Sequence, residues 1–191
     1  MFRRAIVAFL ALTLAPAAWA DARQELHAAF ARNVALKSFK ATMVDLSSNK
    51  TVSVVEFQAP DRFRVTPTGA PPSVIIGDTM YMSHDGQTMK MPMPKGTFAK
   101  YRNQDAMKEL EKGTTVESQG MGRVGAQPAR MYRFLSAKGK DQYTSTVWVG
   151  VASGQVLQLE TSGKSAGKPF SMRMLYTDFN SPAIKVVPPA Q

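Results

Sequence analysis

The chain has 191 residues, a formal net charge of +10 at pH 7 and no cysteine. The lack of cysteine excludes disulfide bonds, a thiol nucleophile and the acylated cysteine that would make the protein itself a lipoprotein. Its basic residues are spread along the sequence without a run of five or six, which argues against a basic nucleic-acid-binding arm. This charge favours diffuse attraction to anionic surfaces such as phospholipid headgroups, and it also serves solubility.

The beginning of the chain has the pattern of a secretory signal peptide over residues 1–20. Two arginines precede an apolar run from Ala5 to Leu14, and the small-residue pattern Ala18-Trp19-Ala20 follows it. The run is too short to span a bilayer, so we expect cleavage, export to the periplasm and a single domain over residues 21–191. A retained anchor helix is the alternative.

An amphipathic helix is predicted to open the domain over residues 21–37. Apolar side chains recur there at helical spacing and share one face. They are Ala22, Leu26, Ala29, Phe30 and Val34.

Almost everything after this helix is predicted to be antiparallel sheet, because short β-branched or alternating segments are separated by turn residues. We expect about eleven strands in a mainly β fold with a few helices. The clearest candidates are residues 38–46, 51–57, 60–65, 74–76, 80–82, 88–94, 129–134, 143–149, 155–160 and 170–179.

One segment interrupts the strands. Residues 103–113, "NQDAMKELEKG", have the pattern of a capped helix with Met107 and Leu110 on one face. A short helix between two blocks of strands is expected to cover the concave face of a curved sheet.

The sequence contains few residues or motifs that are typical of catalysis. The segment "GMGRVG", residues 120–125, has the letters of a dinucleotide-binding fingerprint, but Pro128 and a strand-like segment follow where a helix should open. We therefore predict a glycine-rich turn there. The only histidines are His27 and His84, and no G-x-S-x-G motif occurs. We predict that the protein is not an enzyme and uses no cofactor or metal.

The most unusual feature is a group of five methionines between residues 80 and 93. In strands, successive side chains alternate between the two faces of the sheet. Met80 and Met82 are therefore predicted to share one face, as are Met89, Met91 and Met93.

Two prolines constrain the same segment. Pro92 and Pro94 lack amide donors, and amides two residues apart point to the same neighbouring strand. The strand is therefore predicted to lie at an edge of the sheet. In a polyproline conformation, the alternative, the methionines would lose their common face.

Three interpretations of the methionines remain open. Flexible thioether side chains accept apolar ligands of varied shape. Thioether sulfur also suits Cu(I), but alternate side chains of one strand lie roughly 6.5–7 Å apart and converge only if the segment folds back on Met80, Met82 or His84. Ordinary packing in the core is the third interpretation.

Several segments, in this order, resemble the LolA-like family, the periplasmic carriers of outer-membrane lipoproteins and their lipid-binding relatives. They are "SFKATM", "FQAPDRFRV", "VIIGDTMYMSHDG", "GMGRVGAQPARMYRF", "VWVGVASGQVLQLE" and "YTDFNSPAIKVVPP". The resemblance implies an incomplete antiparallel β-barrel with a helical lid, an apolar cavity for acyl chains and no catalytic residues. Ala59 stands where the dedicated carrier has an arginine, which favours a divergent relative.

Together these features predict a periplasmic protein that binds acyl chains of lipids or lipoproteins and carries them to the outer membrane. Its partners are expected to be these acyl chains, membrane-bound donor or acceptor proteins and an anionic membrane surface, with no nucleic acid, and the protein is expected to be a monomer. The predicted lipid-binding residues are Ile75, Met80, Met82, Met89, Met91, Met93, Met107, Leu110, Leu157 and Leu159.

Basic residues beside this site are expected to meet headgroups or a membrane surface. They are Lys90, Lys95, Lys100 and Arg102. Two alternative functions remain: a methionine-rich periplasmic copper-binding protein, and an envelope-stress sensor or protein-interaction module with the same fold.

Overall fold

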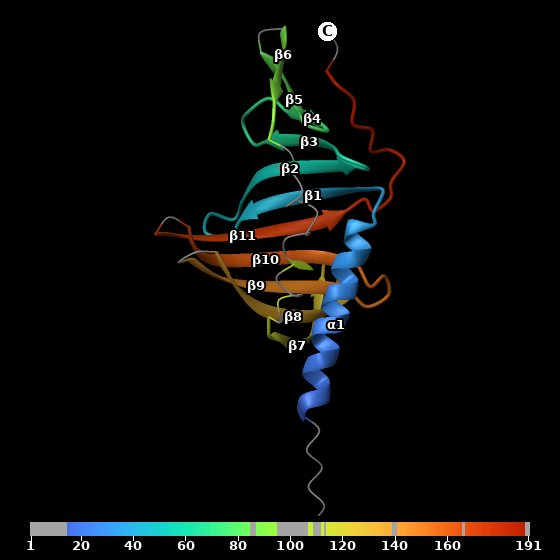
Figure 1. The fold of residues 1–191 in the computed structure, drawn as a ribbon, viewed down its shortest axis with the longest axis vertical. Helices are drawn as coiled ribbons and strands as arrows, with labels where there is room; N and C mark the ends of the chain where they lie inside the picture. The colour runs from blue at the N-terminus through green and yellow to red at the C-terminus, as the bar shows by residue number, and fades with distance from the viewer. Residues whose placement is uncertain are drawn as a thin grey trace, which may run out of the picture.

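The structure, a computed structural model, describes residues 15–84, 87–94, 107–108, 112, 114–138, 141–165 and 167–189. Most of these residues belong to one helix and the strands of one sheet (Figure 1). The elements are α1 (Ala15–Val34), β1 (Ser38–Asp45), β2 (Lys50–Gln58), β3 (Arg62–Pro67), β4 (Ser73–Ile76), β5 (Thr79–His84), β6 (Gln87–Pro92), β7 (Val116–Val124), β8 (Gln127–Lys138), β9 (Asp141–Gly150), β10 (Val156–Ser165) and β11 (Lys168–Thr177).

The strands form an 11-stranded sheet in the order β6-β5-β4-β3-β2-β1-β11-β10-β9-β8-β7. Each described pair of neighbours is antiparallel. Among the described residues, β6 and β7 each have one strand neighbour, so the sheet is not closed into a barrel. Figure 1 shows that it is curved. The predicted fold class, a mainly β protein with an incomplete antiparallel barrel, is confirmed.

The pairing of β1 with β11 joins two meanders that are continuous in sequence. We call β1–β6 the upper half and β7–β11 the lower half, as they stand in Figure 1. In the central pair, Ala41 lies opposite Tyr176 and Met43 lies opposite Met174. These four side chains therefore share one face of the sheet, which we call the inner face because it carries the buried core.

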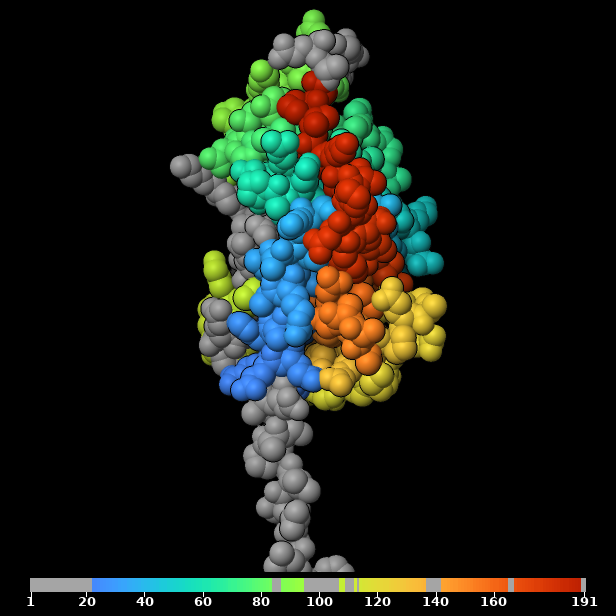
Figure 2. Space-filling view, turned by 90° about the vertical axis from the view of Figure 1, so that its right-hand side faces the viewer, coloured from blue at the N-terminus to red at the C-terminus, as the bar shows by residue number. Residues whose placement is uncertain are grey.

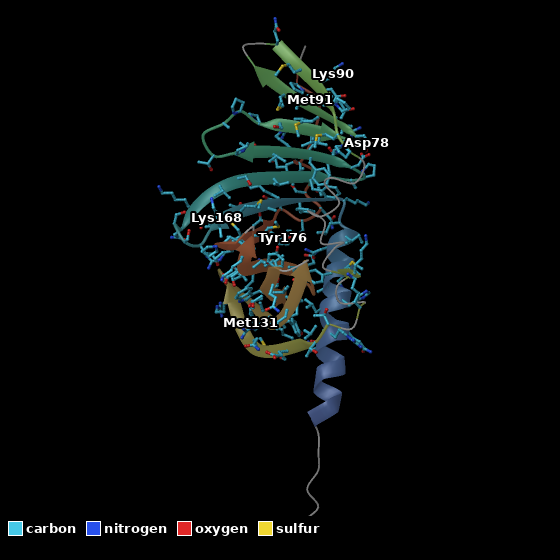
Figure 3. All side chains as sticks on the ribbon, turned by 60° about the vertical axis from the view of Figure 1, so that its left-hand side comes forward. Asp78, Lys90, Met91, Met131, Lys168 and Tyr176 are labelled. Atoms are coloured by element: carbon cyan, nitrogen blue, oxygen red, sulfur yellow. The ribbon has the colours of Figure 1, made fainter. Side chains whose placement is uncertain are left out.

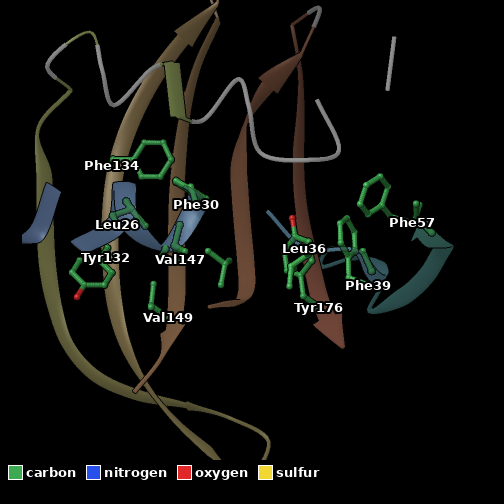
Figure 4. Close-up of a cluster of buried hydrophobic side chains, with 14 of the residues drawn as sticks. Leu26, Phe30, Leu36, Phe39, Phe57, Tyr132, Phe134, Val147, Val149 and Tyr176 are labelled. Carbon is green, nitrogen blue, oxygen red and sulfur yellow. The ribbon is translucent and has the colours of Figure 1, made fainter. Parts of the chain in front are cut away.

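Helix α1 packs on the inner face of the lower half (Figures 1 and 2). Of its predicted apolar face, Ala22, Leu26, Ala29 and Phe30 are buried, whereas Val34 is only half-buried. The ring of Phe30 meets that of Phe134 edge-on, with centroids 6.5 Å apart (Figure 4). The helix begins at Ala15 and ends at Val34, earlier at both ends than the predicted residues 21–37.

The core continues across the middle of the sheet as a row of aromatic rings (Figure 4). Phe39 and Phe57 are directly opposite in register, with ring centroids 5.0 Å apart. Phe63 follows at 5.1 Å from Phe57, and Ile75 lies opposite Phe63. The inner face is therefore apolar from α1 to the strands that carry the methionines.

The prediction of a glycine-rich turn at residues 120–125 is wrong for most of that segment. Residues 120–124 belong to β7, which pairs with β8, and only Gly125 lies in the connecting turn. A register shift between Ser118 and Met121 bulges the strand, and Gly120 has a φ of +79°. Glycine tolerates such a backbone at a bulge, so the residues that resembled a turn shape an edge strand.

Two predicted elements lie wholly or largely outside the described residues. They are the expected signal peptide, of which residues 1–14 lie outside, and the expected helix at 103–113, of which most residues lie outside, including Leu110. Within the described part, no helix is both long enough and apolar enough to cross a membrane.

Candidate functional site: a methionine face at one edge of the sheet

The inner face of β4, β5 and β6 carries a compact group of apolar side chains. Ile75 lies opposite Met80, which lies opposite Met91, and Met82 lies opposite Met89 in the next rung. Residues directly opposite one another in an antiparallel pair project to the same side of the sheet. We call Ile75, Met80, Met82, Met89 and Met91 the methionine face.

The methionine face changes from buried to exposed toward the edge of the sheet. Ile75 is 1% exposed, and Met80 is half-buried against the core. Met89 and Met91, on the outermost strand, are 45% and 39% exposed. Figure 3 shows Met91 on the hairpin at the top of the molecule, far from α1. This exposed apolar edge makes the methionine face the candidate binding site of the described residues.

The two prolines have the role predicted for them. The amide of Met93 donates to the carbonyl oxygen of Asp78 at 2.8 Å, so the nitrogens of its neighbours Pro92 and Pro94 face away from β5. The missing donors thus lie on the free side of β6, which is an edge strand. The predicted edge and the predicted strand conformation of β6 are both confirmed.

The other predicted site residues are distributed differently. Met93 follows β6 and is half-buried, and Met107 and Leu159 pack against the core cluster. Leu157 is buried beside Gly150 at a bulge in β10 and is not a member of that cluster. Leu110 lies outside the described residues.

Two further methionines extend this surface and were not singled out from the sequence. Met43 and Met174 lie opposite each other in β1 and β11, and Met174 also lies opposite Leu159. Both pack partly exposed against the core. They connect Leu159 to the upper half, so the inner face is rich in methionine well beyond the edge hairpin.

The C-terminal segment, residues 178–189, packs on the opposite, outer face of β4 and β5. Val186 is fully buried there, and with Ile184 it packs on Val74 and against Tyr81. The backbone of Val186 donates to Gln58 Oε1 at 2.8 Å. Arg64 donates to the carbonyl oxygen of Lys185 at 3.0 Å while it pairs with Glu56 at 2.6 Å.

The one described cation among the predicted headgroup contacts also lies on the outer face. The ammonium group of Lys90 is 5.9 Å from the centre of the Tyr81 ring, and these two residues are directly opposite in β5 and β6. The methionines alternate with them and therefore face the other way. Lys95, Lys100 and Arg102 lie outside the described residues.

The lower half is closed by contacts between α1 and the sheet. Glu25 accepts hydrogen bonds from Arg130 and from the hydroxyl group of Tyr132. The side chain of Asn33 donates to the carbonyl oxygen of Val156 at 3.3 Å and accepts from its amide at 3.0 Å. Asn33 is 3% exposed, and the sequence pattern did not identify it because its partner lies 123 residues away.

A pocket of about 540 Å³ lies elsewhere, beside β7 and β8. Five of its seven lining residues are charged or polar, and the other two are Phe134 and Leu135. The lining residues are Lys112, Thr114, Thr115, Glu117, Arg133, Phe134 and Leu135. This mixed lining differs from the uncharged methionine face.

Comparison with known proteins identifies the fold. The lipoprotein LppX of Mycobacterium tuberculosis superimposes with a TM-score of 0.64 at 12% sequence identity, covering 88% of this chain and 99% of its own. LprF of Mycobacterium bovis also gives a TM-score of 0.64 at 12% identity, covering 90% and 98%. No family model and no curated protein sequence matches the chain. The chain has the open, LolA-like fold of LppX and LprF, as the sequence resemblance predicted.

Proposed function

We propose that the protein binds acyl chains of lipids or lipoproteins on the methionine face and carries them through the periplasm toward the outer membrane. The observation that carries this proposal is the continuous apolar inner face, which runs from a fully packed core to exposed Met89 and Met91. The fold shared with the lipoprotein LppX supports a role in the cell envelope. The signal-like sequence at residues 1–20 supports export.

The inner face is covered by α1 in the lower half and stays partly exposed at the methionines, which is where an acyl chain would bind. Helix α1 packs on the lower half, where Leu26 and Phe30 are fully buried. In the upper half the outermost side chains keep exposed apolar surface that an acyl chain would remove from water. Each buried methylene contributes about 0.8 kcal/mol, so ten would supply roughly 8 kcal/mol before the cost of association.

Methionine suits a carrier because its cargo varies. An unbranched thioether side chain has three rotatable bonds and adapts to acyl chains of different length and unsaturation. Met80 and Met82 would form the floor of the site and Met89 and Met91 its movable outer wall. Met43, Met174 and Leu159 would extend the apolar path toward the core.

A binding experiment with matched variants tests this function. The exported protein is purified without detergent and titrated with a fluorescent, zwitterionic lysophospholipid, whose neutral net charge removes simple Coulomb effects. Replacing Met89 and Met91 together by Asp should weaken binding at least tenfold, because each carboxylate must be desolvated under the chain. The single change Met121→Asp, at a methionine that is 63% exposed on β7, should leave binding within twofold.

The control distinguishes loss of the site from loss of the fold. Both variants alter exposed side chains, so their far-ultraviolet spectra and unfolding temperatures should match those of the unmodified protein. Unchanged affinity in the Met89 and Met91 double variant would contradict the proposed site. Equal weakening in both variants would indicate nonspecific adsorption.

A further inference from the structure

The methionines of the β5–β6 hairpin are paired across the two strands. Met80 lies opposite Met91, and Met82 lies opposite Met89. In an antiparallel pair of strands, hydrogen-bonded and non-hydrogen-bonded residue pairs alternate. The amide of Met93 donates to the carbonyl oxygen of Asp78, so this pair is hydrogen-bonded. Counting along the register from there, both methionine pairs are hydrogen-bonded pairs as well. Four thioethers therefore stand in a two-by-two arrangement on one face.

This arrangement brings the sulfur atoms within reach of one point. Opposite Cα atoms in hydrogen-bonded pairs are about 5.5 Å apart, and successive side chains on one face are roughly 6.5–7 Å apart along a strand. Rotation about the first two side-chain bonds of a methionine moves its sulfur by several ångströms, so sulfur atoms of neighbouring rungs can approach one another. A single extended strand lacks this convergence, whereas the folded hairpin provides it.

The surroundings also suit a cation. Register places Phe63, Val65 and Ser73 beside the methionines on the inner face, and none of them carries a charge. Lys90 lies over the Tyr81 ring on the outer face. Met89 and Met91 are 45% and 39% exposed, so an ion can reach their sulfur atoms from solvent.

We propose that Met80, Met82, Met89 and Met91 form a thioether site for a soft monovalent cation, with Cu(I) as the biological metal. Thioethers favour Cu(I), whereas carboxylate and carbonyl oxygens suit Mg²⁺ and Ca²⁺. Binding forms sulfur–metal bonds and transfers no electron. This activity goes beyond acyl binding and uses a different property of the same residues: the sulfur lone pairs rather than the apolar surface.

Leucine substitution separates the two properties. Leu is similar to Met in volume and apolar character, but it has no sulfur donor. Changing Met80, Met82, Met89 and Met91 together to Leu should abolish the metal site, because no thioether donor remains in it. The double variant Met89→Leu with Met91→Leu changes only the exposed pair and serves if the fourfold variant does not fold.

Ag(I), which has the soft, monovalent character of Cu(I) and is stable in air, is the probe. The full exported chain is titrated with silver nitrate in chloride-free buffer by calorimetry and examined by native mass spectrometry. The unmodified protein and Met121→Leu should bind one Ag(I) with equal affinity, and the fourfold variant at least a hundredfold more weakly. The exposed-pair variant should lose at least tenfold.

Two results would overturn the metal site: no Ag(I) uptake by the unmodified protein, or equal uptake by the leucine variants. The lysophospholipid titration of the same samples is read separately. Loss of Ag(I) binding with retained lipid binding supports both functions. Loss of lipid binding in the leucine variants would count against acyl-chain binding by the apolar surface of the methionine face. It would not count against the metal site.

Discussion

At Tyr132, burial and a neighbouring charge act on the same side chain. Its ring lies in the core, and its hydroxyl group donates to Glu25 on α1, which also pairs with Arg130. Burial, followed by the hydrogen bond to Glu25 and the charge of Glu25, raises the pKa of Tyr132 to about 12. The Glu25 carboxylate likewise raises the pKa of Arg130. The contact between α1 and β8 therefore requires a protonated tyrosine.

The raised pKa predicts a pH dependence of stability. The ordinary value is 10.0, so between pH 10 and about 12 the folded state holds this proton more tightly than the unfolded state does. The stabilisation is complete below pH 10 and is lost as the pH rises through this window. Denaturant titrations from pH 9 to pH 11.5 should therefore show that the free energy of unfolding declines less steeply with pH for Tyr132→Phe than for the unmodified protein. Identical slopes would contradict this assignment.

At the scale of elements, the C-terminal segment braces the strands that carry the methionine face. Val74 and Tyr81 point to the outer face, where Ile184 and Val186 cover them, while Ile75 and Met80 point inward. The same two strands thus have one face packed by the end of the chain, and their other face carries part of the methionine face. Figures 1 and 2 show this segment running along the side of the molecule toward the upper half.

Adjacent valines provide a matched test of this brace. Val186 is 0% exposed and Val187 is 55% exposed. Val186→Ala should lower the free energy of unfolding by about 1–3 kcal/mol, because it removes buried methyl groups and leaves a cavity. Val187→Ala should change it by less than about 0.5 kcal/mol. Denaturant titration measures both, and equal effects would show that the segment does not pack as described.

The edge hairpin could be predicted from the sequence because side-chain alternation and proline placement are patterns of only a few neighbouring residues. Alternation of Met80 with Met82 and of Met89 with Met91 fixed their faces, and Pro92 fixed the free side of β6. Strand β7 was missed because its glycines indicate a turn, and only pairing with β8 around a bulge makes this segment a strand. The pairing of Asn33 with Val156 has no local signal at all.

At the scale of the whole molecule, the inner face of one sheet has a part that α1 covers and a part that stays exposed at the sheet edge. The lower half is filled by α1 and held by Glu25 and Asn33. The upper half ends in exposed thioethers at an edge that prolines keep from pairing with another strand. The strand pattern predicted an antiparallel sheet, and the resemblance predicted its open architecture. The meeting of Met43 with Met174 could not be predicted, because it depends on pairing between the two halves.

Photo-crosslinking tests the central claim, that the methionine face holds the acyl chain, most directly. The full exported protein is irradiated with a lysophospholipid that carries a diazirine near the end of its acyl chain, and the labelled peptides are mapped by mass spectrometry. We expect adducts on β5 and β6, residues 79–92, and their displacement by unlabelled lysophospholipid. Displaceable adducts confined to the pocket beside β7 and β8, around Glu117 and Leu135, would contradict the account.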